Sequence, residues 1–354
     1  MSRISVLFVC LGNICRSPTA HVVFQSMVDK QGLSDQIYVD SCGTGDWHIG
    51  HAPDSRSQQH ALNRGYQMDN LRARLVVDND FDQFDYIIGL YDPYYYALDT
   101  KISENYKKYN HIIQHTKAIF YQSLALQKFV LNKKLYLNIL RNHGFPVLDT
   151  YSLKITDKMN STQVLQKIKI YCSRWNTNIF ITKPQPGGFG IGFKKWNLEK
   201  LQKNYKPLNN YLQKIKELPK IEAPYLLIQN FVPDFEQFYE IRTYWLCGKY
   251  SHSLGTIIDP LSLGTSGFEK VKYAYPKNEY PSDDIIEHMD NIPEIIDNKL
   301  IQNLKKIGSK IFHLLPEKNP FIFRIDFGCC LQNKNICRDY FISEIEYLPN
   351  IFPE

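Results

Sequence analysis

The stretch VLFVCLGNICRS, residues 6–17, ends an apolar run on Cys10 and reaches Arg16 and a serine within one short loop. The run that precedes the loop, residues 4–10, has the β-branched and apolar composition of a fully buried strand. The stretch that follows, SPTAHVVFQSMVDKQG (17–32), places apolar side chains at helical spacing and ends on a glycine. The sequence therefore predicts a buried strand, a short loop and a helix, in that order.

The same alternation continues through the first hundred residues. Strands are expected at IYVDSCGT (37–44) and FDYIIGLYD (84–92), and SRSQQHALNRG (55–65) is expected to be a helix between them. Strands that alternate with helices indicate a parallel, doubly wound sheet. In such sheets a ligand binds beyond the carboxyl ends of the strands, which is where the loop after the first strand lies.

The residue types in this loop suit the binding of a phosphate group. Gly12 and Asn13 tolerate the positive φ that lets successive backbone amides converge on an anion. The following helix N-terminus favours negative charge, and a thiol at this position, Cys10, is favoured as the nucleophilic thiolate. Arg16 offers a planar fork to two phosphate oxygens, and Ser17 can hydrogen-bond the sulfur.

This loop resembles the phosphate-binding loop of the low-molecular-weight protein tyrosine phosphatase family. The resemblance continues through residues 41–74 and 81–92 and covers about residues 4–100. It implies a mechanism in which Cys10 attacks phosphorus, Arg16 and the loop amides bind the phosphoryl oxygens, and an aspartate protonates the leaving group. The arsenate reductases share this fold and loop and are a minor alternative.

The general acid is the point at which the chain departs from that family. In the family, an Asp-Pro-Tyr-Tyr-Gly segment carrying the acid follows a fourth strand, whereas DPYYY (92–96) here directly follows the third. Either Asp92 matches the loop after the family's third strand and the acid is lost, or a deletion has fused the two segments and Asp92 is the acid. In both cases we expect the fourth strand to be absent and the domain to be truncated.

The pattern changes after about residue 104. Residues 117–143 are expected to form a helix, and NIFITKPQPGGFGIGFKKW (178–196) reads as a strand that ends near Lys183 and enters a glycine-rich loop. Such a loop lets the backbone approach phosphates closely, and a lysine at the strand end can reach them. The loop glycines proposed to bind the nucleotide are Gly187, Gly188 and Gly190.

A second group of polar residues falls on a predicted hairpin. FIFRIDFGCCLQ (321–332) and DYFISEIEYLPN (339–350) have strand composition. Alternation along a strand places Arg324 and Asp326 on one face of the first strand, and two glutamates on one face of the second. Three carboxylates that face one another suit Mg²⁺ with its waters and a phosphate. The predicted magnesium ligands are Asp326, Glu344 and Glu346.

These motifs resemble the ATP-grasp superfamily, which includes D-alanine–D-alanine ligase, over about residues 110–354. The resemblance implies that two lysines hold the nucleotide phosphates, that the segment IQNFV clasps adenine and that an acid binds ribose. The third metal ligand is usually an asparagine, so a glutamate there adds negative charge. The residues that the resemblance assigns to ATP are Lys133, Lys183, Gln229, Asn230, Phe231, Val232, Glu240 and Arg242.

The implied chemistry is ATP- and Mg²⁺-dependent ligation. A carboxylate takes the γ-phosphoryl group of ATP, steadied by Arg324, and an amine or thiol then attacks the resulting acyl phosphate. The expected architecture is an α/β phosphatase-like domain at residues 1–103 followed by an α+β ATP-grasp domain at 104–354. The alternatives are a ligase whose N-terminal domain is a non-catalytic module for phosphate recognition or acceptor binding, and a regulatory protein in which neither site turns over.

Bulk composition is consistent with this assignment. A length of 354 residues favours two domains, and the net charge of +6 is scattered and indicates anionic substrates rather than nucleic acid. The chain has no apolar stretch long enough for a membrane span, and its eight cysteines form no paired framework. We therefore expect a cytoplasmic protein without a membrane partner, whose partners are ATP, carboxylate and amine substrates, and a phosphorylated protein or small phosphate ester.

Overall fold

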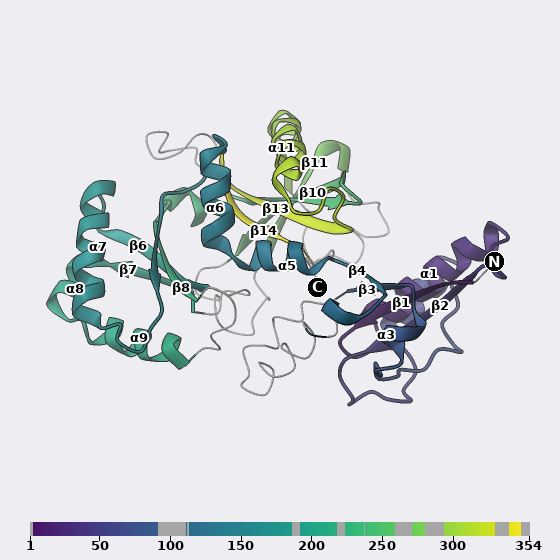
Figure 1. Cartoon of the computed structure of the whole chain (residues 1–354). Helices are drawn as coiled ribbons and strands as arrows, with labels where there is room; N and C mark the ends of the chain where they lie inside the picture. The colour runs from purple at the N-terminus through teal and green to yellow at the C-terminus, as the bar shows by residue number, and fades with distance from the viewer. Residues whose placement is uncertain are drawn as a thin grey trace. The chain divides into compact units, whose positions relative to one another are not determined.

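The computed structural model describes residues 3–90, 111, 113–185, 192–217, 224–236, 238–258, 271–279, 294–329 and 340–347. Contacts within the chain divide it into two compact units, Met1–Leu124 and Ala125–Glu354, which Figure 1 shows in purple to blue and in blue to yellow. We refer to them as the N-terminal and C-terminal units.

A parallel four-stranded sheet forms the core of the N-terminal unit. Strand β1 (Ile4–Cys10) lies between β2 (Ile37–Gly43) and β3 (Tyr86–Gly89), and β4 (Ile119–Tyr121) extends the sheet beyond β3. All three neighbouring pairs are parallel, as the alternation of strands and helices predicts. The helices whose bounds lie in the described part of this unit include α1 (Arg16–Lys30), α2 (Ser55–Leu62) and α3 (Asp80–Gln83).

The prediction that the fourth strand is absent was wrong, and so was the single helix expected over residues 117–143. Strand β4 occupies part of that stretch and is followed by two helices, α5 (Leu124–Leu131) and α6 (Lys133–Asn142). Tertiary packing explains the difference, because the ring of Phe120 stacks on Phe81 with centroids 6.1 Å apart. The boundary expected between residues 103 and 104 therefore lies before the last strand of the first sheet.

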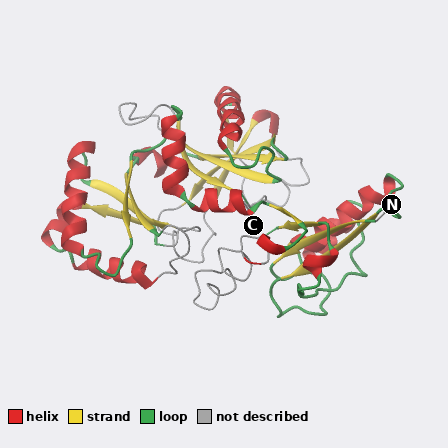
Figure 2. Cartoon of the chain, viewed as in Figure 1, coloured by secondary structure: helices red, strands yellow, loops and turns green. Residues whose placement is uncertain are grey.

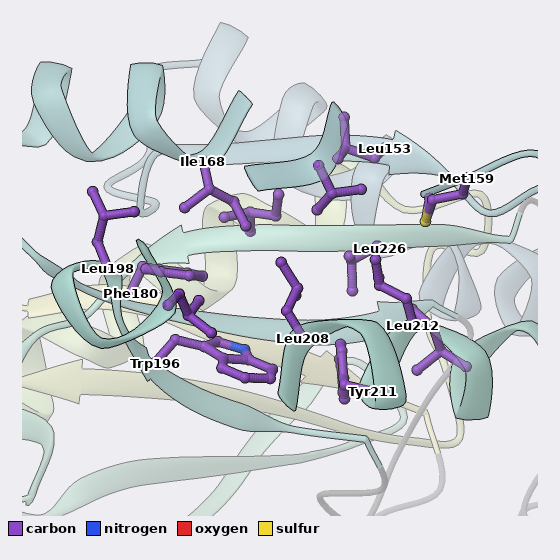
Figure 3. Packing of buried hydrophobic residues seen from close by; sticks show 14 of the residues in the cluster. Leu153, Met159, Ile168, Phe180, Trp196, Leu198, Leu208, Tyr211, Leu212 and Leu226 are labelled. Atoms are coloured by element: carbon purple, nitrogen blue, oxygen red, sulfur yellow. The ribbon is translucent and has the colours of Figure 1, made fainter. Parts of the chain in front are cut away.

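The C-terminal unit contains a four-stranded antiparallel sheet with helices on one face. Its order is β5-β8-β6-β7, and Figure 3 shows side chains of β6, β7 and β8 meeting those of the helices. Phe180, Leu226 and Trp196 pack there with Ile168, Leu208 and other apolar residues. The elements are β5 (Thr150–Lys154), α7 (Ser161–Trp175), β6 (Ile179–Gln185), β7 (Lys194–Asn197), α8 (Leu198–Lys203), α9 (Lys206–Glu217) and β8 (Tyr225–Asn230).

The second sheet of this unit has six strands in the order β12-β11-β10-β9-β13-β14. Every pair is antiparallel except β11 and β12, so the sheet is mixed, and its long strands are visible in yellow in Figure 2. Helix α11 contacts β9 and β10. The elements are η2 (Pro233–Glu236), β9 (Glu240–Leu246), β10 (Lys249–Ile258), β11 (Val271–Pro276), η3 (Lys277–Glu279), β12 (Glu294–Ile296), α11 (Asn298–Ile311), η4 (Phe312–Leu314), β13 (Ile322–Cys329) and β14 (Tyr340–Glu346).

Within the described part of the chain, none of the helices combines the length and the apolar composition that crossing a bilayer requires.

Candidate functional site

The sulfur of Cys10 lies at the carboxyl end of the central strand β1, directly before the loop that leads into α1. Cys10 is buried, and its Sγ accepts hydrogen bonds from the backbone N–H of Asn13 at 3.3 Å and from the hydroxyl of Ser17 at 3.0 Å. Two donors aimed at one sulfur stabilise negative charge on it. The loop therefore presents a hydrogen-bonded thiol at the N-terminal end of a helix.

Asn13 fixes the shape of this loop. It has the positive φ of 52° expected from its residue type, and it is buried. Its amide nitrogen donates to the hydroxyls of Ser17 at 2.9 Å and Ser41 at 3.1 Å, while its Oδ1 accepts from the backbone N–H of Arg74 at 2.9 Å. Sequence reasoning found Asn13 but missed Ser41 and Arg74, because their role depends on contacts between distant segments.

The side chain of Arg74 anchors the segment that supports the loop. Its guanidinium donates to Asp40 at 2.8 and 2.9 Å and to Asp80 at 2.9 and 3.1 Å. Burial alone would lower the pKa of Arg74, but these two carboxylates raise it above its ordinary value. Arg74 thus stays charged, and its backbone N–H is held in place for Asn13.

The other residues predicted for phosphate chemistry are less enclosed. Arg16 is exposed at the start of α1, and its Nη1 donates to the carbonyl oxygen of Leu90 at 3.0 Å. Asp92 lies outside the described residues. Strand β4 is followed by Gln122 and Ser123, and the whole stretch 105–148 contains neither Asp nor Glu. A carboxylic acid after the fourth strand, the position typical of the resembling family, is therefore missing from the sequence.

Gly43 allows the loop after β1 to lie against the end of β2. A Cβ at this position would meet the carbonyl oxygen of Leu11 at 2.6 Å and the backbone N of Asn13 at 3.0 Å. We expect Gly43→Ala to displace the loop at a cost of about 1–3 kcal/mol. Hydrogen exchange of peptides covering residues 10–17 should become faster.

Gly89→Ala is the matched control, because its Cβ would meet only the carbonyl oxygen of Tyr121, at 3.7 Å. Equal exchange in the two variants would show that the loop does not depend on the close approach at Gly43.

A second polar site lies on the six-stranded sheet of the C-terminal unit. In the register of β13 and β14, Asp326 lies opposite Glu344, and Arg324 lies opposite Glu346. Ligand oxygens of Asp326, Glu344 and Glu346 all lie within 4.8 Å of one another. On the other side of β13, Asp326 pairs with Arg242 of β9. The structure therefore brings together the three predicted metal ligands and two predicted arginines.

Arg324 organises the carboxylates of this site. It is buried, it donates to both oxygens of Asp326 at 2.6 and 2.7 Å, and its Nη2 lies 2.9 Å from an oxygen of Glu346. Burial alone would lower the pKa of Arg324, but Asp326 and Glu346 raise it well above its ordinary value. Glu346, which stands where an asparagine is usual in the resembling superfamily, is thus held by an ion pair with Arg324.

The two predicted phosphate-binding lysines reach the same region from different elements. Lys133, at the start of α6, is buried and forms an ion pair with Glu344. Lys183 lies on β6 and is half-buried. Burial lowers the pKa of both lysines, and the charge of Lys133 further lowers the pKa of Lys183, to about 7. A polyphosphate chain would relieve the repulsion between them.

Glu240 and Arg242 form a pair on β9 beside these groups. The guanidinium of Arg242 lies 3.2 Å from an oxygen of Glu240, and the hydroxyl of Ser343 donates to the other oxygen at 2.7 Å. Burial and the neighbouring Asp326 raise the pKa of Glu240. A further hydrogen-bond donor, such as a sugar hydroxyl, would therefore stabilise the ionised form of its carboxylate.

The segment predicted to clasp adenine ends β8. Gln229 is buried and lies opposite Thr150, whose Oγ1 accepts from its Nε2 at 2.7 Å. Asn230 lies opposite Phe180 of the apolar core, and its buried Oδ1 has no hydrogen-bond partner among the described residues. Two further predicted residues follow directly, namely Val232, which is buried, and Phe231, whose ring centroid lies 3.8 Å from the Nζ of Lys195.

The glycine-rich loop is described only at its ends. Gly187, Gly188 and Gly190 lie outside the described residues, whereas Gln185 ends β6 and Gly192 precedes β7. The carbonyl oxygen of Gly192 accepts a hydrogen bond from the Tyr211 hydroxyl at 2.7 Å.

The donor set on β13 and β14 fits a hard divalent cation. Carboxylate oxygens are the ligands that Mg²⁺ takes from proteins, together with waters and substrate phosphates. The ammonium group of Lys133 already lies against Glu344, so this position accepts positive charge. The residues that would hold the cation are Asp326, Glu344 and Glu346.

Sequence comparison with known proteins finds relatives for the N-terminal part of the chain. Residues 5–126 match the family model described as low molecular weight phosphotyrosine protein phosphatase. The chain is 49% identical over 87 residues to the low molecular weight protein-tyrosine-phosphatase YfkJ of Bacillus subtilis, which covers 25% of this chain and 56% of that protein. It is 48% identical over 84 residues to the low molecular weight phosphotyrosine protein phosphatase of Homo sapiens, covering 24% and 52%. The chain spans about half the length of the curated relatives it matches.

Solved structures match the chain over nearly its whole length. D-cycloserine synthetase DcsG matches with a TM-score of 0.55 at 11% identity, over 97% of this chain and 91% of that one. D-alanyl-alanine synthetase A from Vibrio cholerae matches with a TM-score of 0.55 at 12% identity, over 100% and 91%. At these identities the likeness concerns the fold alone. Residues 5–126 thus resemble the phosphatase family in sequence, and the whole chain resembles the two synthetases in fold.

Proposed function

We propose that the C-terminal unit is an ATP- and Mg²⁺-dependent ligase that joins a carboxylate to an amine or thiol through an acyl phosphate. The proposal also makes the N-terminal unit a phosphatase with Cys10 as its nucleophile. The observation that supports the ligase most strongly is the convergence of three carboxylate ligands within 4.8 Å, with Lys133 and Arg324 paired to them. The proposal places the protein in the cytoplasm, because ATP is its substrate.

In the ligase, the chain's own residues bind and orient the reactants. Lys133, Lys183 and the glycine-rich loop would hold the ATP phosphates, Glu240 the ribose, and Gln229 with the backbone of residues 230–232 the adenine. Bound Mg²⁺ would neutralise charge on the phosphates. Arg324 would stabilise the phosphoryl group as the substrate carboxylate attacks it and ADP leaves. The amine or thiol would then attack the acyl carbon and release inorganic phosphate.

In the phosphatase, the thiolate of Cys10 would attack the phosphorus of a phosphorylated protein or small phosphate ester. The loop amides and Arg16 would bind the phosphoryl oxygens, and Ser17 would support the sulfur. Asp92 would give its proton to the leaving oxygen. Water would then cleave the thiophosphate, return a proton to Asp92, release phosphate and restore the thiolate of Cys10. The hydrogen bonds from Asn13 and Ser17 to the sulfur support this role.

A screen for acceptor-stimulated ADP release tests the ligase. The whole chain would be incubated with Mg²⁺, ATP and pools of amino acids and peptides, and ADP would be measured with a coupled assay. We expect release only when both a carboxylate and an amine or thiol acceptor are present. If ADP is released at the same rate with and without every pool, the result would contradict ligation.

ATP binding should take up a proton through Lys183. The pKa of this lysine in the free protein is about 7, and phosphates favour its charged form. Above pH 7 the free lysine is mainly neutral, so ATP affinity should fall as pH rises, by up to about tenfold per pH unit. Calorimetry at pH 8 in buffers of different ionisation enthalpy measures the uptake.

The variant Lys183→Met should lose this proton uptake while any uptake by other groups remains. Binding enthalpies that are identical in all buffers for the unmodified chain would contradict the assignment of Lys183 to the phosphates.

One observation favours a second candidate function for the N-terminal unit, namely phosphate recognition without efficient turnover. No Asp or Glu occurs in residues 105–148, the stretch that includes β4 and the segment after it. Without an acid, a phenolate would have to leave unprotonated, and only esters with good leaving groups would react.

The variant Asp92→Asn separates the two candidates. If the acid is lost, we expect phenyl phosphate hydrolysis to stay within about threefold of the unmodified chain, whereas an acid role would make it fall by about 10²-fold or more. Hydrolysis of p-nitrophenyl phosphate is the internal control, because its leaving group needs little protonation. A fall confined to phenyl phosphate would identify Asp92 as the acid.

A further inference from the structure

Gln185 joins strand β6 to the start of helix α6, and no sequence motif singled it out. Its Oε1 accepts a hydrogen bond from the backbone N–H of Lys134 at 2.7 Å, and its Nε2 donates to Oδ1 of Asn132 at 3.1 Å. Gln185 is 1% exposed, so both bonds are shielded from water. A single buried amide thus connects two elements that lie about fifty residues apart in the chain.

The contact is made at the helix terminus, where backbone donors lack partners. The first N–H groups of an α-helix have no intrahelical acceptor. Asn132 caps α6 in the usual way, since its Oδ1 accepts from the N–H of Leu135 at 3.1 Å. Gln185 supplies an acceptor for a second N–H, that of Lys134, from a different element. The position of this helix end is therefore tied to β6.

Gln185 lies close to both lysines that are candidates for binding phosphate. Lys133 lies between Asn132 and Lys134, and Lys183 precedes Gln185 by two positions on the same face of β6. Because Gln185 bonds to the residues on both sides of Lys133 and lies two positions from Lys183, the two lysines come from adjoining backbone segments.

Consistent with this, the charge of Lys133 lowers the pKa of Lys183. The two ammonium groups repel each other, and the ion pair of Lys133 with Glu344 offsets this repulsion only for Lys133. A contact that fixes the helix end against β6 keeps the lysines at a defined separation.

We propose that Gln185 is a positioning residue that holds Lys133 beside Lys183 so that both ammonium groups meet one polyphosphate chain. The proposal rests on the ligase function in one respect, because that function identifies the polyphosphate as the phosphates of ATP. Gln185 itself acts through the backbone of Lys134 and the side chain of Asn132. A merely structural cap would stabilise α6 without affecting how the two lysines interact.

The test compares the whole chain with Gln185→Met, which keeps the length of the side chain and removes both hydrogen bonds. The matched control is Asn160→Ala, because Asn160 caps helix α7 through the N–H of Gln163 at 2.9 Å. Competitive labelling with acetic anhydride at several pH values, read by mass spectrometry, follows the titration of Lys183. Calorimetry measures the Kd of MgATP.

In Gln185→Met we expect the titration of Lys183 to move part of the way toward the ordinary lysine range, because Lys133 is no longer held beside it, whereas burial, the larger cause of the lowered pKa, remains. The Kd of MgATP should rise by at least about tenfold. Asn160→Ala should change neither quantity. A second variant, Asn132→Ser, keeps a cap for α6 but shortens the acceptor for Gln185, and it should shift Lys183 in the same direction by less.

An unchanged titration of Lys183 in both Gln185→Met and Asn132→Ser would overturn the proposal, and so would an equal loss of MgATP affinity in Asn160→Ala. If the unmodified chain binds no MgATP, the ligase function fails, but the labelling experiment still decides whether Gln185 positions the lysines. If Gln185→Met does not fold, the labelling profile of Asn132→Ser alone decides the question.

Discussion

Replacing Glu344 by glutamine is expected to lower acceptor-stimulated ADP release by about 10²–10³-fold, the usual effect of removing one well-placed electrostatic group. Glu344 is one of the three converging carboxylates, and it also carries the ion pair with Lys133. The amide keeps the shape of the side chain but removes the negative charge that both the cation and Lys133 need. Glu344 is half-buried on β14, whose pairing with β13 is made by backbone hydrogen bonds, so the variant should fold.

The measurement is the initial rate of ADP formation at saturating acceptor, with Glu199→Gln as the control. Glu199 is an exposed residue of α8 that accepts a hydrogen bond from Asn178 at 2.7 Å, and it lies outside the candidate site. Direct binding of Mn²⁺ with ATP, followed by electron paramagnetic resonance, should weaken in the same variant. A rate within about threefold of the unmodified chain would remove Glu344 from the metal site.

Replacing Cys10 by serine should abolish aryl phosphatase activity, with a loss of roughly 10⁴-fold or more, because the nucleophile itself is removed. Serine is nearly isosteric and can still accept from the N–H of Asn13 and the hydroxyl of Ser17. The loop should therefore still bind inorganic phosphate. Hydrolysis of p-nitrophenyl phosphate measures the loss, and calorimetry with phosphate measures the retained binding.

Cys247→Ser is the matched control, because Cys247 is an exposed thiol in the β9–β10 turn. Hydrolysis by Cys10→Ser at the rate of the unmodified chain would show that Cys10 is not the nucleophile. Absence of hydrolysis in the unmodified chain, with phosphate still bound, would favour the recognition function instead.

Charge balance gives a physical reason for the unusual third carboxylate. Among the residues that the structure describes, the candidate site of the C-terminal unit holds four acidic side chains and four basic ones, so the glutamate at position 346 is matched by a basic group. Arg324 contacts both Asp326 and Glu346, and Arg242 contacts Glu240. The acidic residues are Asp326, Glu344, Glu346 and Glu240, and the basic ones are Lys133, Lys183, Arg242 and Arg324.

The parts of the fold that follow from local patterns were predictable. A short apolar strand that ends on Cys10 has one parallel neighbour on each side, as the alternation of strands and helices indicated. On the hairpin, the two-residue period alone placed Asp326 and Glu344 on facing strands. These features could be read because strand periodicity determines which side chains share a face.

Features that depend on tertiary contacts could not be read in the same way. Strand β4 is only three residues long and lies in an apolar stretch that also suits a helix, so only its pairing with β3 distinguishes it. Gly43 and Arg74 act on the loop after β1 from other segments. Gln185 is one polar residue among many until α6 is placed against it.

The most direct test of the ligase proposal follows an oxygen atom. Once an acceptor pair is known, its carboxylate would be labelled with ¹⁸O and the inorganic phosphate product analysed by mass spectrometry. Attack of the carboxylate on the γ-phosphoryl group transfers one labelled oxygen into each phosphate, and this is the result that the account predicts. Phosphate without ¹⁸O, formed alongside ADP, would mean that water attacks ATP and would contradict the acyl phosphate.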